Sequence, residues 1–271
     1  MMNGTLNKLK EILKGCGSAV VAFSGGLDST FLASVAQEVL GNKALAVTSI
    51  SPSLPSRDRR DAEEAVKALG LKHRFIETHE LEDERYAANP ENRCFYCKNE
   101  LFRQLSSLAK SEGYAVVLDG SNADDIRDFR PGRKAGEEWN VRSPLLEAGL
   151  TKAEIRELAR KRKLVVWDKP PSACLSSRIP YGASITPQAL KQIDAAETVL
   201  RELGFRQVRV RHHDRLARIE VERSEIPRLV SDGVKEQVSK ALKAAGYLFV
   251  TVDLEGYRTG SLNEAIKKDG P

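Results

Sequence analysis

The sequence has no apolar run long enough to cross a membrane. Runs such as residues 19–23 and 247–250 fall far below the ~20 residues that a spanning helix needs. No basic start followed by an apolar stretch opens the chain, and no internal repeat or low-complexity tract interrupts it. We therefore expect a cytoplasmic protein that is neither secreted nor bound to a membrane.

Cysteine is scarce, with four residues at positions 16, 94, 97 and 174. An even count in a small secreted domain would suggest disulfides, but nothing else here is secretory. The cysteines are therefore better explained as cytosolic thiols and by metal chemistry. Cys16, beside an apolar run, is interpreted as a small buried hydrophobic residue.

Neither sign of charge dominates. Forty-three Lys and Arg against 38 Asp and Glu leave a net charge of +5, which suits phosphorylated ligands and does not call for a nucleic-acid partner. The composition, 41% hydrophobic and 30% charged, is that of an ordinary globular protein. A chain of 271 residues can hold one large domain, or a medium and a small one.

Apolar runs alternate with helical periodicity through residue 163. Strands are expected at residues 19–23, 44–50, 73–76 and 115–118, and helices at residues 6–13, 31–40, 58–69, 99–110 and 151–163. Thr151 and Glu154 have the spacing of a capping box. This alternation predicts an α/β fold with a doubly wound parallel sheet, in which ligands bind at the carboxyl ends of the strands.

Prolines mark the expected domain boundary. Pro170-Pro171 and Pro180-Tyr181-Gly182 make the stretch near residues 167–186 irregular. We predict a nucleotide-binding domain at residues 1–170, a linker at 171–185 that carries Cys174, and a smaller α+β domain at 186–271. The elements expected in the small domain are helices at 186–203 and 234–245, a hairpin of strands at 205–210 and 216–221, and a strand at 247–254.

A glycine-containing loop follows the first expected strand. It reads Ser24-Gly25-Gly26-Leu27-Asp28-Ser29-Thr30. The glycines let backbone N–H groups approach an anion, and the next helix offers its positive end. The hydroxyls add donors, and Asp28 can hold Mg²⁺ beside phosphates. The loop lacks the Lys and the spacing of a Walker A motif, so transfer of a γ-phosphate is disfavoured. The alternative is a strand-to-helix turn without chemical consequence.

Further polar candidates surround this loop in the expected sheet. Asp124 and Asp125 follow the strand at 115–118 and are candidates for contacts to Mg²⁺ or a ribose. Paired acids also commonly begin a helix. Lys98 could neutralise a phosphate or an activated carboxylate, or it could be a solvated surface residue.

Cys94 and Cys97 form a C-x-x-C pair. Zinc, a redox dithiol, an iron–sulfur cluster and chance all compete to explain it. Cys174 is a plausible third sulfur. Three thiolates without an obvious fourth ligand fit a [4Fe-4S] cluster with one open iron; ordinary thiols are the alternative.

Residues 24–29 resemble the SGGxDS motif of the PP-loop ATP pyrophosphatases, which include GMP and NAD synthetases, argininosuccinate synthetase and tRNA thiolation enzymes. The resemblance implies that Ser24, Gly25, Gly26 and Ser29 hold the pyrophosphate end of ATP and that Asp28 supports catalysis. It also implies adenylation of an acceptor oxygen with release of pyrophosphate.

The whole chain resembles the LarE family, ATP-dependent sulfur insertases of nickel-pincer nucleotide biosynthesis. The matching segments are residues 24–29, Asn92-Arg93-Cys94-Phe95-Tyr96-Cys97-Lys98, Asp119-Gly120-Ser121-Asn122-Ala123-Asp124-Asp125, Arg142-Ser143-Pro144-Leu145 and Pro171-Ser172-Ala173-Cys174-Leu175-Ser176-Ser177-Arg178.

In that family the cysteine of the Ala-Cys-Leu segment is central to sulfur transfer, so Cys174 is assigned a catalytic role. One family variant gives up that cysteine's own sulfur, and the other binds a [4Fe-4S] cluster through three cysteines. Having Cys94 and Cys97 beside Cys174, this sequence resembles the cluster-dependent variant, with sulfide on the open iron as donor. The sacrificial use of Cys174 stays open.

The family's substrate is a pyridinium dicarboxylate mononucleotide, whose phosphate needs a site. Arg209 and Arg211 alternate on an expected strand, so they share a face and can grip one phosphate; Ser176, Ser177 and Arg178 are further candidates. Three glutamates are lesser candidates for polar contacts, with a surface position favoured for each: Glu197, Glu220 and Glu222. His212 and His213 would point to opposite faces of a strand and receive no role.

Two rival functions remain at this level. A cluster-dependent tRNA thiolation enzyme would share the loop and the cysteines, but the modest charge and the lack of a recognisable RNA-binding appendage stand against it. A non-catalytic regulator that keeps the fold is the second. For the expected enzyme, the remaining partners are a sulfide or another sulfur donor and, through the small domain, further copies of the chain.

Overall fold

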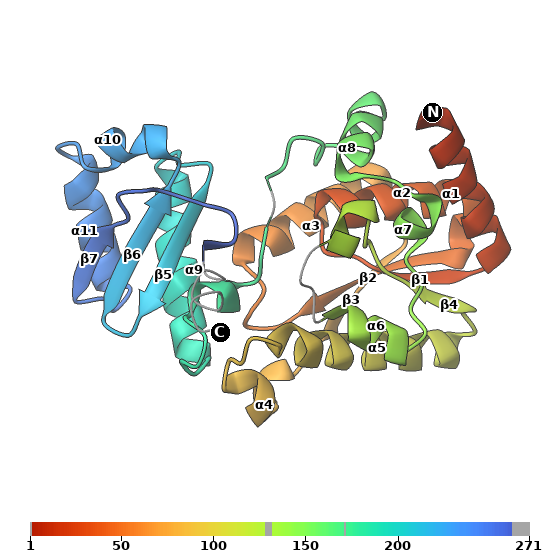
Figure 1. Ribbon diagram of the computed structural model, residues 1–271, viewed down its shortest axis with the longest axis horizontal. Helices are drawn as coiled ribbons and strands as arrows, with labels where there is room; N and C mark the ends of the chain where they lie inside the picture. The colour runs from red at the N-terminus through yellow and green to blue at the C-terminus, as the bar shows by residue number, and fades with distance from the viewer. Residues whose placement is uncertain (1, 128–131, 171, 262–271) are drawn as a thin grey trace. The chain divides into compact units, whose positions relative to one another are not determined.

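The computed structural model describes residues 2–127, 132–170 and 172–261, and it divides into two compact units (Figure 1). The first unit comprises Met1–Ser51, Ser56–Glu80 and Asn92–Ser172. The second comprises Pro52–Pro55, Leu81–Glu91 and Ala173–Pro271. Each unit has a hydrophobic core of its own. None of the helices in the described ranges is long and apolar enough to cross a membrane.

A four-stranded parallel sheet forms the centre of the first unit. Its order is β3-β2-β1-β4, and the strands are β1 (Ala19–Ala22), β2 (Ala44–Ile50), β3 (His73–Glu77) and β4 (Val116–Leu118). Ala19 lies opposite both Ala44 and Val116. Alternate residues of β1 enter different cores, Val21 on one face and Val20 on the other. The sheet is therefore buried on both faces, as its continuous apolar strands require.

Helices cover both faces of this sheet (Figure 1). One core takes residues from α1 (Met2–Cys16), α2 (Leu27–Leu40), α3 (Ser56–Leu69), α7 (Pro144–Ala148) and α8 (Lys152–Lys161). The other takes residues from α5 (Arg93–Glu112) and α6 (Gly132–Glu138). Short 3-10 segments η1 (Gly41–Lys43), η2 (Glu80–Glu82) and η3 (Ala123–Arg127) connect these elements. The prediction of a doubly wound α/β fold is confirmed.

The second unit is built on a three-stranded mixed sheet of order β5-β6-β7. The strands β5 (Val208–His213) and β6 (Leu216–Val221) pair antiparallel as a hairpin, and β7 (Phe249–Val252) runs parallel to β6. The core lies between this sheet and the helices α9 (Pro187–Glu202) and α11 (Val234–Ala244). Shorter elements complete the unit: α4 (Glu84–Ala87), η4 (Leu175–Arg178), η5 (Arg223–Glu225) and α10 (Ile226–Leu229).

Several expected boundaries differ from the observed ones. The strands β2 and β6 match their predictions residue for residue, and Thr151 and Glu154 form the predicted capping box. The start of a helix at residue 99 was wrong, because α5 begins at Arg93 and includes the C-x-x-C pair. Asn92 at the N-cap is of a residue type that often begins a helix, but its side chain makes no capping bond here.

Candidate functional site

The loop after β1 is pressed against α3. Phe23 N–H donates to Val47 O at 2.8 Å, which holds the end of β1 on β2. Gly25 has a φ of +68°, and a Cβ atom at this position would lie 2.8 Å from the Cα of Ala62 in α3. Both the backbone conformation and the close approach therefore require glycine at residue 25.

Hydroxyl groups tie the two ends of the loop together. The Oγ atoms of Ser24 and Ser29 are 3.0 Å apart, and Ser24 N–H donates to Ser29 Oγ at 3.2 Å. Gly26 is the N-cap of α2, and Thr30, one turn into the helix, is fully buried. The structure thus places Ser24, Gly25, Gly26 and Ser29 together at the positive end of a helix, an arrangement suited to anion binding.

Asp28 and Asp124 are joined through Lys152, the first residue of α8. Lys152 Nζ forms an ion pair with Asp28 Oδ2, and the Lys152 N–H donates to Asp124 Oδ2 at 2.8 Å. Sequence reasoning missed Lys152, whose one signal was its position directly after the capping residue Thr151. Asp28 therefore has a cationic side chain beside it in the folded protein.

The loop after β4 lies close to the start of α2. A Cβ atom at Gly120 would stand 3.1 Å from Ser29 N. Asp119 Oδ1 accepts from Ser143 Oγ at 2.7 Å, and buried Asp125 accepts from Asn122 N–H at 3.0 Å. These bonds shape the loop next to the glycines. The roles predicted for Asp124 and Asp125 with Mg²⁺ or ribose stay predictions.

A second lysine missed by sequence reasoning contacts a backbone carbonyl of the loop. Lys169 Nζ donates to the carbonyl of Gly25 at 3.3 Å. Its charge is balanced by two carboxylates of α3, Asp61 at 2.7 Å and Asp58 at 3.2 Å. Only 10% of the Lys169 side chain is exposed, and its sequence signal was merely its place before two prolines.

The C-x-x-C pair lies in the first two turns of α5, in the first unit. Cys94 and Cys97 are three residues apart, so they share a face of the helix. Cys94 is exposed and Cys97 partly exposed, and both are thiols. Lys98 follows them, with its ammonium 5.1 Å from the ring centroid of Phe102. Its predicted contact to phosphate or carboxylate stays a prediction.

Cys174 belongs to the second unit, where its backbone is held firmly. Its carbonyl accepts three hydrogen bonds: from Ser177 N–H at 3.0 Å, Ser177 Oγ at 2.8 Å and the Arg178 guanidinium at 3.0 Å. The Cys174 thiol is partly exposed. A turn fixed in this way gives the thiol a defined position at the start of η4.

Arg178 connects this turn to the core of the second unit. Its side chain is fully buried and binds Glu197 of α9 through two parallel hydrogen bonds, at 2.7 and 2.9 Å. It also donates to Ala173 O at 2.7 Å. The phosphate contact predicted for Arg178 stays a prediction, while these bonds favour a role in positioning Cys174.

The surface positions favoured for Glu197 and Glu220 were wrong. Glu197 is 0% exposed and Glu220 is 1% exposed, while Glu222 is exposed as expected. Burial opposes the ionisation of Glu197, but the charges of Arg178, Arg201 and Arg209 outweigh burial and lower its pKa to about 2. A carboxylate can be buried here because arginines surround it.

The side chains of Arg209 and Arg211 lie on the same face of β5, because those of Val208 and Val210 face the core on the other side. Arg211 binds Glu220 through two hydrogen bonds of 2.8 Å and donates to Ser177 O at 2.8 Å. The guanidinium of Arg209 lies 5.2 Å from the ring centroid of Tyr257. Burial and the neighbouring charge of Arg178 lower the pKa of Arg209 to about 10, so it remains cationic at pH 7.

The two predicted serines have different surroundings. Ser176 is fully buried, and its hydroxyl lies 2.7 Å from Tyr86 Oη. Ser177 is tied to Cys174 and Arg211 through the bonds described above. The structure therefore gathers Cys174, Ser177, Arg178 and Arg211 into one connected network. Whether Ser176, Ser177, Arg209 and Arg211 bind a phosphate stays a prediction.

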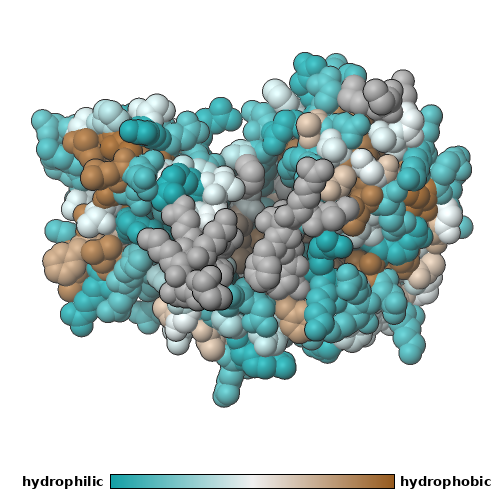
Figure 2. Space-filling view, viewed as in Figure 1, coloured by the Kyte–Doolittle hydropathy of each residue, from teal (hydrophilic) through white to brown (hydrophobic). Residues whose placement is uncertain are grey.

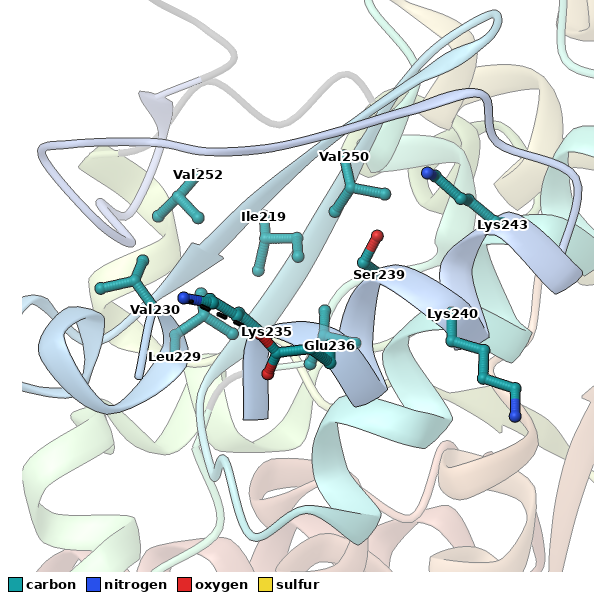
Figure 3. A pocket seen from close by; sticks show the side chains of 11 residues that line it. Ile219, Leu229, Val230, Lys235, Glu236, Ser239, Lys240, Lys243, Val250 and Val252 are labelled. Atoms are coloured by element: carbon teal, nitrogen blue, oxygen red, sulfur yellow. Dashed lines mark ion pairs between the residues drawn. The ribbon is translucent and has the colours of Figure 1, made fainter. Parts of the chain in front are cut away.

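A cavity of about 580 Å³ opens in the second unit between the sheet and the helices α10 and α11 (Figure 3). Ile219, Val250 and Val252 are among its apolar lining residues, and Lys235 and Lys243 are among its charged ones. The predicted site residues lie elsewhere. Figure 2 shows a mainly hydrophilic surface with separate apolar patches, one of them over the α10 end of this unit.

Within the described ranges, no group of three or more His, Cys, Asp and Glu side chains is arranged to hold a metal ion. The predicted cysteine ligands belong to both units, Cys94 and Cys97 to the first and Cys174 to the second. The cluster is therefore not shown.

Residues 13–167 match the family model described as asparagine synthase. The chain is also similar to the NH₃-dependent NAD⁺ synthetase of Finegoldia magna, with 31% identity over 60% of this chain and 67% of the relative. Together with the parallel sheet and the glycine loop at the start of α2, these matches define the chain as a PP-loop ATP pyrophosphatase.

Two relatives extend over almost the whole chain. The pyridinium-3,5-bisthiocarboxylic acid mononucleotide synthase of Lactiplantibacillus plantarum is 36% identical over 96% of this chain and 94% of its own length. An uncharacterised protein of Synechocystis is 43% identical over 99% of this chain and 100% of its own length. The chain belongs to the LarE family of ATP-dependent sulfurtransferases.

Proposed function

We propose that this protein adenylates a carboxylate of a pyridinium mononucleotide with ATP, releases pyrophosphate, and replaces AMP with sulfur to give a thiocarboxylate. The observation that carries the proposal is the similarity to the L. plantarum synthase, which extends through both units. The geometry of the loop after β1 supports the ATP half of the reaction.

In the first step, a carboxylate oxygen of the substrate attacks the α-phosphorus of ATP, and the bond to the pyrophosphate oxygen breaks. The backbone N–H groups at the start of α2 and the hydroxyls of Ser24 and Ser29 bind the departing pyrophosphate. Asp28 is suited to hold Mg²⁺ beside it. Lys98 and Lys152 carry positive charge that can offset the charge on the phosphates.

In the second step, a sulfide nucleophile attacks the acyl carbon and AMP leaves with the electrons of the acyl–oxygen bond. The protein contributes position and charge neutralisation. We assign the substrate phosphate to the second unit, at Arg209 and Arg211 with Ser176 and Ser177. Positive charge is in excess around Glu197, because three arginines surround this one carboxylate: Arg178, Arg201 and Arg209. A phosphate would offset that excess.

We further propose that Cys94, Cys97 and Cys174 would hold a [4Fe-4S] cluster, which supplies the sulfide when bound. The donor set fits, because all three are thiols, Cys94 and Cys97 share an accessible helix face, and the Cys174 turn is held in place. Arg178 and Glu197 orient that turn from the core.

The alternative uses the sulfur of Cys174 itself. Its thiolate would attack the acyl-adenylate and expel AMP, and loss of the Cα proton would then break the Cβ–S bond, leaving a thiocarboxylate and dehydroalanine. The partly exposed thiol on a fixed turn is compatible with this route. The two routes differ in whether the protein turns over repeatedly.

Anaerobic purification followed by iron and sulfide analysis distinguishes the two routes. The cluster proposal expects about four irons per chain after reconstitution and repeated turnover, both lost in Cys94→Ala, while ATP-dependent pyrophosphate release is retained. Iron-free protein with a loss of one sulfur from Cys174 would instead establish the sacrificial route. Cys16→Ala is the matched control, since Cys16 is buried in a hydrophobic core of the first unit.

A tRNA thiolation enzyme remains the rival function. It predicts tRNA binding that weakens steeply with salt, and thiolated tRNA as product. Our proposal expects pyrophosphate release from ATP only when a carboxylated pyridinium mononucleotide is added, and no stimulation by tRNA. Stimulation by tRNA alone would overturn it.

We also propose that the second unit mediates self-association. Leu248 and Phe249, at the start of the edge strand β7, are 52% and 62% exposed. An apolar residue beside unpaired strand edges favours pairing with another chain. The mass of the protein in solution, measured by sedimentation, tests this assignment.

A further inference from the structure

The Gly25–Gly26 peptide has two faces that point in opposite directions. It is a trans peptide, as are all the described peptide bonds, so its C=O and N–H groups are antiparallel. The Gly25 carbonyl points to Lys169 Nζ at 3.3 Å. The Gly26 N–H therefore points the other way, toward the Ser24 hydroxyl, whose Oγ is 3.4 Å from Gly26 N.

This orientation decides whether the loop attracts or repels an anion. With the Gly26 N–H turned into the loop, a phosphate meets a donor; with the peptide rotated by half a turn, it would meet the carbonyl oxygen. Two consecutive glycines rotate readily, because neither has a Cβ atom to restrict it. The two glycines let phosphate approach the loop, but they do not fix the orientation of the peptide between them. A contact from another part of the chain must therefore hold that orientation.

We infer that Lys169 is a positioning residue that holds the Gly25–Gly26 peptide with its N–H turned toward the phosphate site. The inference rests on the proposed function, because it assumes that the loop binds pyrophosphate. Lys169 is suited to this role because it is 10% exposed and fixed by Asp58 and Asp61 of α3. Its ammonium approaches the loop from the side of the carbonyl, opposite the hydroxyls.

Asp58, which binds Lys169, also binds Ser172, the last residue of the first unit. Ser172 Oγ donates to Asp58 Oδ2, the carboxylate group that also pairs with Lys169. Lys169 and Ser172 thus both bind α3, and Ser172 lies two residues before Cys174. Asp58 and Asp61 take part by fixing the ammonium, and no contact of either carboxylate with the nucleotide is required.

Calorimetric titration with Mg-pyrophosphate and, separately, with AMP tests this role in the full-length protein. Lys169→Met should weaken pyrophosphate binding about tenfold or more and leave AMP binding within about twofold. Lys169→Arg, which can still donate to the carbonyl and the carboxylates, should restore most of the affinity. Lys161→Met is the matched control, because Lys161 is an exposed lysine of the same unit paired with Glu157.

Simple loss of positive charge must be separated from loss of orientation. The double variant Lys169→Met with Asp61→Asn removes one charge of each sign, so it should bind pyrophosphate as poorly as Lys169→Met. Affinity restored to the wild-type value would overturn the inference in favour of a charge effect. Wild-type affinity in Lys169→Met would also overturn it, whereas a wild-type protein that binds neither ATP nor pyrophosphate would contradict the proposed function itself.

Discussion

The anion sites that we propose in the two units are built in opposite ways. In the first unit, the loop after β1 relies on the backbone, with glycines, a helix N-terminus and two serines. In the second, buried arginines surround buried glutamates at Arg178–Glu197 and Arg211–Glu220. A backbone site depends on conformation and tolerates no added atoms, whereas a side-chain site depends on the balance of buried charge.

The largest expected effect on stability comes from removing the carboxylate of the buried ion pair between Arg178 and Glu197. Glu197→Gln leaves Arg178 and Arg201 without their carboxylate, so the second unit should lose about 3–5 kcal/mol of stability. Urea unfolding measures the loss. Glu202→Gln on the exposed face of the same helix serves as the control and should change stability by less than about 0.5 kcal/mol; equal losses in the two variants would contradict a role for the buried network.

Low pH should destabilise the second unit through protonation of Glu197. The pKa of Glu197 is lowered from 4.5 to about 2 in the folded protein, so its contribution of about 3 kcal/mol is fully present above pH 4.5 and is lost as the pH falls toward 2. Unfolding measured between pH 6 and pH 3 should therefore show a slope that Glu197→Gln lacks. An unchanged slope in that variant would assign acid sensitivity to other carboxyl groups.

In the first unit, a single methyl group should be enough to disrupt the loop. Gly25→Ala places a Cβ atom against Ala62 and strains a φ of +68°, so pyrophosphate release should fall about 100-fold, or about 3 kcal/mol in activation free energy. Gly15→Ala, a helical position with open space around it, is the control. Near-normal release by Gly25→Ala would show that the loop geometry does not govern ATP use.

A smaller effect is expected at the arginines of β5. Arg211→Lys loses the paired hydrogen bonds to Glu220, so the KM for the mononucleotide should rise about tenfold, or about 1.4 kcal/mol. The KM for ATP should stay within about twofold if ATP binds to the first unit. Arg215→Lys at the exposed hairpin turn is the control. A rise in the KM for ATP alone would reverse the assignment of the two ligands.

The smallest effect on catalysis is expected at β7. Phe249→Lys should lower the sedimentation mass of the protein while changing the rate per chain by less than about twofold, because β6 separates the edge strand β7 from β5, which carries Arg209 and Arg211. Val165→Lys, which replaces a 63% exposed residue of the first unit, is the control. The same mass for the wild type and Phe249→Lys would remove β7 as the interface.

Local patterns in the sequence predicted the fold well. The apolar run of β2 and the capping box of α8 are complete within a few residues, and both were located correctly. The glycine loop was also visible, because the motif occupies consecutive positions. The start of α5 was missed, although its N-cap, Asn92, is of a residue type that often begins a helix.

Parts of the site that depend on distant residues were not predictable. Lys169 reaches Gly25 across 144 positions, and Lys152 reaches Asp28 across 124. Sequence spacing contains no signal of such contacts. Glu197 looked like a surface residue because a buried carboxylate is rare unless it is paired, and its partner Arg178 lies in the irregular segment before α9.

The most direct test of the proposed reaction follows an oxygen atom. With the substrate carboxylates labelled by ¹⁸O, attack on the α-phosphorus and displacement by sulfide transfer one labelled oxygen to AMP. We predict singly labelled AMP and unlabelled pyrophosphate, one of each per thiocarboxylate formed. Unlabelled AMP, or ADP and phosphate as products, would contradict adenylation of the carboxylate on the loop that follows β1.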